Sequence, residues 1–216
     1  MLPLLLGVVP FSVVYSVAAR QAGLSYLDTV LMSLIVFAGA SQLIAVTLFG
    51  AGSSPILVVL ITLLVNSRHL LLGVSLSPFL RQLNSKLQGL LAFILTDEVF
   101  AVTIAHHTRA SPSYRYQLGA GLALYAAWNI TTAISAALIF PLSISLASVL
   151  RFIVPASFLA LLVPMVRKRT DVVVGLSSGV AALILVPYLK GGAYILPASL
   201  IGMIVGGLLS FLWKSR

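Results

Sequence analysis

Residues 55–80 read PILVVLITLLVNSRHLLLGVSLSPFL, an apolar run with Asn66, Arg68 and His69 at its centre. A helix needs about 20 mostly apolar residues to cross a bilayer, and this run is long enough. A charged side chain in the middle of such a span costs roughly 2.5–3.5 kcal/mol on insertion scales, so its presence indicates function. The run therefore predicts a membrane helix with a polar site inside it.

The composition extends this interpretation to the whole chain. Of 216 residues, 60% are hydrophobic and 8% are charged, whereas average globular proteins have roughly 45–50% and about 25%. The net charge of +9 reflects few acids, four against thirteen bases, and these bases are dispersed between apolar runs. Nucleic-acid binders cluster their bases on one face, so no nucleic-acid partner is expected. The absence of cysteine excludes disulfides, thiol catalysis and thiolate metal sites.

Apolar runs of similar length recur along the chain, and none shows the alternating segments of about ten residues that are typical of barrel strands. The runs cover residues 2–19, 27–49, 55–80, 87–105, 118–140, 150–166, 172–189 and 193–213. We therefore predict an all-α fold, a polytopic transmembrane helical bundle of about seven or eight spans. It would form a single integral membrane domain over residues 1–216, surrounded by the lipid bilayer, with residues 141–147 along the interface.

A weak internal regularity concerns the third and sixth runs. Three residues recur at one constant offset, Pro55, Pro78 and Arg81 as Pro141, Pro164 and Arg167. The offset superimposes the first three runs on the next three, and a shift of three spans inverts their orientation, as in many transporters. This pattern predicts a 3+3 inverted repeat followed by additional C-terminal helices; the alternative is coincidence among apolar residues.

The second charged cluster, Asp97 and Glu98, lies at the centre of residues 87–105. One interpretation is that Arg68 pairs with one of these acids and holds two helices together, because pairing offsets part of the desolvation cost. The other is that the charges line a translocation path, and the two are compatible. On a continuous helix Arg68 points nearly opposite Asn66, so either the helix has two polar faces or it unwinds there.

Other candidates are weaker. Pro10 with Phe11 inside the first run predicts a kink, or a break that lines a substrate path. Gln42 follows a stretch of small residues, which indicates either close helix packing or contact with a substrate. Asn129 belongs to a polar and aromatic stripe that is typical of packing. Ser177 matches a nucleophile pattern but lacks the strand-to-helix elbow that this chemistry requires.

Several of these motifs together resemble the azaleucine-resistance, or AzlC-type, family of branched-chain amino acid exporters. They are PFS at residues 10–12, AGLS at 22–25, FAGASQ at 37–42, VNSRH at 65–69 and TDE at 96–98. The resemblance covers the first four runs, and the second half is similar only in length and hydropathy. Departures are a very short N-terminal segment and Ser12 where glycine is expected.

The resemblance implies the large subunit of a bacterial inner-membrane exporter of valine, leucine and isoleucine, working with a small AzlD-type membrane partner. From the residues we expect no catalysis, no cofactor and no metal site. The residues supply a consistent site, because a zwitterion needs a cation for its carboxylate, which Arg68 can offer, and an anion for its ammonium. Asp97 or Glu98 can serve as that anion or carry a coupling proton. Two rival hypotheses are an assembly subunit whose charges only join helices, and an intramembrane hydrolase using Ser177 with His69.

Overall fold

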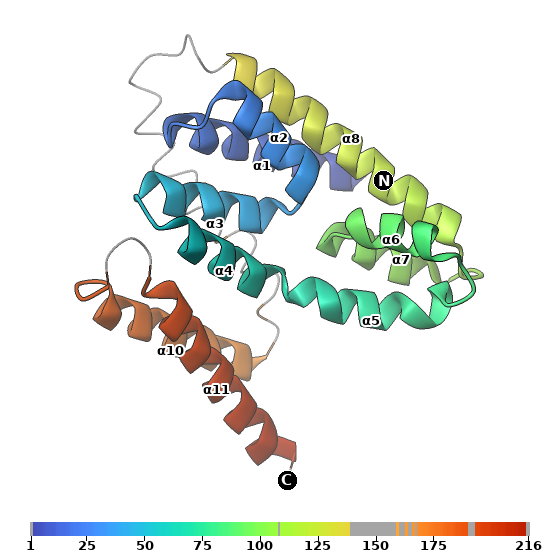
Figure 1. Cartoon of the computed structure of the whole chain (residues 1–216). Helices are drawn as coiled ribbons and strands as arrows, with labels where there is room; N and C mark the ends of the chain where they lie inside the picture. Colours follow the sequence, from blue (N-terminus) through green and yellow to red (C-terminus); the bar gives the residue numbers. More distant parts are fainter. Residues whose placement is uncertain are drawn as a thin grey trace.

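The computed structural model describes residues 2–107, 109–138, 168–189 and 193–214, together with the single residues 159, 163 and 166. Within these residues the chain forms α-helices and no strands, as predicted (Figure 1). The helices are α1 (Leu2–Gln21), α2 (Tyr26–Val36), α3 (Gly39–Gly50), α4 (Pro55–Asn66), α5 (Arg68–Leu80), α6 (Ser85–Phe93), α7 (Asp97–His107), α8 (Tyr114–Leu138), α10 (Arg169–Leu185) and α11 (Ile195–Lys214).

Local capping signals explain where several helices begin. Ser25 and Asp28 form a capping box at the start of α2, in which each side chain bonds the backbone N–H of the other. The Ser54 hydroxyl accepts from the Leu57 N–H before α4, and the Asn84 side chain accepts from the Leu87 N–H before α6. These bonds satisfy N–H groups that have no partner inside the helix.

Helices α1, α2 and α8 form one packed unit (Figure 1). Buried hydroxyl groups bond across it: Ser135 of α8 donates to Ser16 of α1 at 2.8 Å, and the Tyr15 hydroxyl donates to the Thr29 carbonyl of α2 at 2.9 Å. Such polar contacts join helices in an apolar environment, where small and hydroxylated residues allow close approach. Helix α3 packs on α1 and on α4, and α7 packs on α8.

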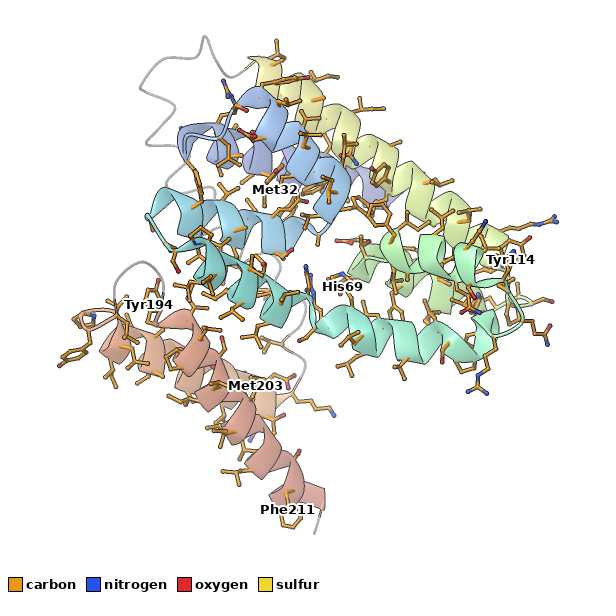
Figure 2. All side chains as sticks on the ribbon, viewed as in Figure 1. Met32, His69, Tyr114, Tyr194, Met203 and Phe211 are labelled. Carbon is orange, nitrogen blue, oxygen red and sulfur yellow. The ribbon has the colours of Figure 1, made fainter. Side chains whose placement is uncertain are left out.

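The C-terminal helices α10 and α11 pack chiefly on each other. Gly202 and Gly206 of α11 face α10, where an added Cβ would contact Ser178 and Val174 respectively. Figure 2 shows apolar side chains along the outside of the helices, among them Met203 and Phe211 of α11, which are largely exposed. An apolar exterior is what a helix in contact with lipid requires.

Three of the predicted apolar runs are interrupted near their middle. Residues 27–49 break at Phe37 and Ala38, residues 55–80 break at Ser67, and the α6–α7 pair is bent by 119° at residues 94–96. The irregular geometry predicted between Asn66 and Arg68 is present as a one-residue interruption, but the chain does not unwind there, because Ser67 keeps right-handed helical angles. At Pro10, by contrast, α1 continues without interruption, so the predicted break there is wrong. Proline removes a single backbone bond, and extensive packing of α1 against α8 holds the helix together.

The span count remains a prediction. Among the described residues, 55–80 taken together and α8 are each long and apolar enough to cross a membrane, and the bent α6–α7 pair would make a third span. Three further apolar helices, α2, α3 and residues 195–211, are shorter. Three of the predictions fall outside the described residues. They are the sixth run, of which only isolated residues are described, the interfacial segment 141–147, and the second members of the repeat.

Candidate functional site

The three helix breaks meet around one pocket with a volume of about 210 Å³. Its lining comes from α1, from both sides of the Phe37 break, from the start of α5, from the start of α7 and from α8. Pockets for drug-sized ligands typically hold roughly 300–1,000 Å³, so this one suits a small solute. Three helices, α3, α5 and α7, begin at this pocket.

The first break depends on backbone conformation and on one buried amide. Phe37 adopts the left-handed region, with φ 39° and ψ 49°, and ends α2 by donating its N–H to the Ser33 carbonyl. A residue other than glycine is uncommon in this region and persists only where its surroundings fix it. The fully buried Gln42 contributes to this, because its Oε1 accepts from the Ala38 N–H at 3.3 Å. Gln42 thus contacts the backbone behind the pocket.

The second break places a guanidinium and an imidazole at the pocket wall. Ser67 separates α4 from α5 and donates its N–H to the Leu64 carbonyl. Arg68 and His69 follow at once, so both side chains line the pocket despite being neighbours in sequence. His69 Nδ1 donates to the Asn66 carbonyl at 3.2 Å, which leaves Nε2 as the second ring nitrogen. Figure 2 shows His69 at the junction of α4 and α5.

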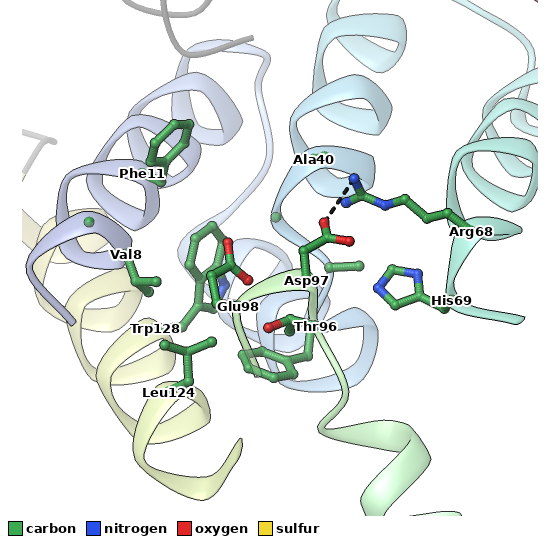
Figure 3. Close-up of a pocket in the computed structure, with 14 residues that line it drawn as sticks. Val8, Phe11, Ala40, Arg68, His69, Thr96, Asp97, Glu98, Leu124 and Trp128 are labelled. Atoms are coloured by element: carbon green, nitrogen blue, oxygen red, sulfur yellow. Dashed lines mark ion pairs between the residues drawn. The ribbon is translucent and has the colours of Figure 1, made fainter. Parts of the chain in front are cut away.

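The third break supplies the acids. Thr96 caps α7 by accepting the Val99 N–H on its Oγ1 at 3.3 Å, and Asp97 and Glu98 form the first turn. Carboxylates are favoured at this end of a helix by its positive dipole. Arg68 Nη1 lies 2.9 Å from Asp97 Oδ2, so the predicted contact between Arg68 and an acid is formed with Asp97 (Figure 3). Glu98 also lines the pocket and has no ion-pair partner among the described residues.

The structure brings together five of the nine residues singled out from the sequence. Those lining the pocket are Phe11, Arg68, His69, Asp97 and Glu98. Pro10, Gln42, Asn66 and Asn129 do not line it, and the Asn129 Nδ2 donates to the Tyr125 carbonyl of its own helix at 2.9 Å. Whether any of these residues acts in transport stays a prediction.

Sequence reasoning missed several wall residues, notably Gly39, Ala40 and Trp128. Gly39 and Ala40 were visible only as small residues that suit packing, and Trp128 only as part of an aromatic stripe. Ser177, the alternative nucleophile, lies in α10 and donates to the Val174 carbonyl of the same helix at 2.9 Å. It does not line the pocket that contains His69.

Comparison with known proteins gives a consistent result. The family model described as AzlC protein matches residues 3–140, a range that includes every residue of the pocket. An uncharacterized membrane protein of Archaeoglobus fulgidus is 33% identical over 183 residues, covering 84% of this chain and 79% of the relative. The inner membrane protein YgaZ of Escherichia coli is 31% identical over 193 residues, covering 83% and 78% respectively.

A more distant relative has a more informative name. The branched-chain amino acid transport protein AzlC of Bacillus subtilis is 26% identical over 110 residues, covering 51% of this chain and 43% of the relative. No solved structure matches this chain.

Proposed function

Since this chain belongs to the AzlC family of membrane proteins, we propose that it exports branched-chain amino acids across the bacterial inner membrane. One relative is named a branched-chain amino acid transport protein and another an inner membrane protein. The observation that carries the proposal is the pocket where three interrupted helices meet and where charges of both signs face apolar walls. Discontinuous helices at a binding site are typical of secondary transporters.

The pocket wall suits the three parts of a branched-chain amino acid. Glu98, which has no ion-pair partner in the described structure, is the group we assign to the substrate ammonium. Val8, Phe11 and Leu124 provide an apolar wall for the aliphatic side chain. Arg68 supplies positive charge toward the carboxylate, although Asp97 already occupies one of its nitrogens at 2.9 Å. A guanidinium has five N–H donors, so this ion pair leaves others for a ligand.

We further propose that a proton and the substrate compete for Glu98. A proton that binds the carboxylate makes it neutral and removes the charge that holds the ammonium, and the ammonium in turn excludes the proton. Only one of the two then occupies Glu98 at a time. Such exclusive binding couples proton entry to amino acid exit, because each movement of the carrier carries one or the other.

A small AzlD-type membrane protein is the partner that the family resemblance implies. In the apolar span 55–80, 6% of the 18-residue window that qualifies it as a span is buried in the part of the chain that the structure describes. Its outer face therefore needs to contact either lipid or another apolar chain. A small membrane subunit could be that chain.

The experiment is transport in proteoliposomes made with the full chain, with and without a small AzlD-type partner. Vesicles loaded with radiolabelled valine should lose it faster when the exterior is made acidic, and unlabelled external valine should accelerate the loss. A chain that acts only in assembly gives no valine movement in either preparation. That result, with both proteins correctly inserted, would contradict the proposed function.

A further inference from the structure

We propose that the first backbone amides of α3, at Gly39 and Ala40, and the indole N–H of Trp128 together bind the carboxylate of the transported amino acid. This inference rests on the proposed function and assigns the anion-binding part of the same site. The hydrogen-bond donors that it assigns to the carboxylate are uncharged groups. Figure 3 shows Trp128 and Ala40 on different elements around the pocket, with Glu98 also pointing into it.

Helix α3 begins at the pocket with unsatisfied donors. The first N–H groups of a helix have no partner within it, and the helix dipole adds partial positive charge there. Ala38, which precedes α3, has no side chain that could cap these groups, whereas α2, α4 and α6 are capped by serine or asparagine. Both Gly39 and Ala40 line the pocket. This is the arrangement in which helix starts bind carboxylates and phosphates.

Trp128 supplies a second, independent donor. Its side chain lines the pocket yet is only 6% exposed, and its Nε1 is buried without a hydrogen-bond partner. An indole N–H can only donate, and a buried donor left unpaired carries a desolvation cost. A bound carboxylate oxygen would remove that cost when the substrate is present.

Close packing fixes Trp128 against the start of α3. A Cβ added at Gly39 would lie 2.8 Å from Cη2 of the indole, so only glycine allows this approach. The ring also stacks on Tyr15, with 6.0 Å between ring centroids. The six-membered ring of the indole therefore lies directly against the start of α3, and both belong to the pocket wall.

The chemistry of an α-amino acid explains why anchors of opposite sign share so small a space. Its ammonium and carboxylate are attached to one carbon atom, so their binding groups must be neighbours. Glu98 for the ammonium and the α3 amides for the carboxylate both line a pocket of about 210 Å³. Neutral donors also suit a site that must release its ligand, because they bind an anion without adding a full charge.

The test compares valine with valinamide, which keeps the ammonium and the branched side chain but has no carboxylate. In the proteoliposome assay, Trp128→Phe should raise the KM for valine at least about tenfold, which corresponds to about 1.4 kcal/mol. Inhibition by valinamide should change less than twofold. The matched control is Tyr125→Phe in the same helix, which loses a donor to the Leu34 carbonyl but does not line the pocket.

A second variant keeps the test decisive if Trp128→Phe does not fold. Ala40→Pro removes one amide donor in the first turn, where the helix itself does not use the N–H and proline is tolerated. This variant should also weaken the binding of valine more than the binding of valinamide. If the unmodified protein transports valine and both folded variants keep its KM within twofold, the carboxylate site is wrong while the transport function stands. If the unmodified protein does not move valine, the proposed function itself fails.

Discussion

A methyl group added at Gly121 tests whether α8 fixes the break between α6 and α7. A Cβ at this position would lie 2.6, 2.7 and 3.0 Å from Cδ1, Cγ1 and Cβ of Ile94. The Ile94 Cβ does not move when the side chain changes rotamer, so the backbone at the break has to shift. Ile94 is 1% exposed. Overpacking of this kind typically costs about 1–3 kcal/mol.

Gly119, two residues earlier in α8, provides the matched control, because a Cβ there would meet nothing within 4 Å. Replacing a helical glycine with alanine gains about 1 kcal/mol of helix propensity, and this gain is common to both variants. The difference in free energy of unfolding between Gly121→Ala and Gly119→Ala should therefore be the steric cost alone, about 1–3 kcal/mol. Equilibrium unfolding by SDS in mixed micelles measures it.

The functional consequence follows from the position of the break. Asp97 and Glu98 come directly after it, so Gly121→Ala should also slow valine export while Gly119→Ala leaves it unchanged. Adding Ile94→Ala removes the two closest carbon atoms and should recover part of the lost stability, as coupled neighbours do in a double-mutant cycle. Equal free energies of unfolding for the two glycine variants, within about 0.5 kcal/mol, would refute this packing argument.

Three further outcomes are expected. Arg68→Ala should destabilise the protein in detergent by about 1–3 kcal/mol, between exposed and fully buried pairs, because the Arg68 and Asp97 side chains are 28% and 43% exposed; strictly additive losses with Asp97→Ala would contradict the pairing. Glu98→Gln should abolish valine export driven by a pH gradient and also raise the KM for valine exchange, because the neutral amide no longer holds the substrate ammonium, and Asp97→Asn should be milder; full export by both variants would exclude a role in coupling. Gly202→Ala should loosen α10 from α11 and lower the thermal midpoint in detergent, whereas Gly207→Ala, with open space around its Cβ, should not.

The extent of the helices was readable from the sequence because hydropathy and capping are local. The run predicted over residues 118–140 corresponds to α8 at Tyr114–Leu138, and the run 172–189 to α10 at Arg169–Leu185. The contact between Arg68 and an acid was also predictable, because an uncompensated charge at membrane depth is costly. The sequence did not determine whether Asp97 or Glu98 forms the pair with Arg68, because this depends on the three-dimensional position of the break.

The breaks themselves were harder to predict because they do not follow the helix propensities of the residues where they occur. Pro10 is the strongest helix-breaking residue type, yet α1 continues through it. Phe37 carries no breaking signal, yet it ends α2, and Gln42 bonds the backbone of the next residue at 3.3 Å. The buried side-chain amide of Gln42, five residues after Phe37, thus helps to hold a break that the residues at the break do not predict.

The same breaks that interrupt the membrane helices also create the pocket, and the two facts have one physical cause. Backbone groups released by a break cannot face lipid, so they must be buried in protein or face a cavity that can offer them partners. At Ser67 and Thr96 nearby carbonyls and hydroxyls satisfy part of this requirement. At α3 no side chain caps the start of the helix, and its first residues, Gly39 and Ala40, line the pocket. An interrupted apolar helix is therefore costly unless something binds there, and a small zwitterion that enters and leaves would satisfy those donors only while it is being carried.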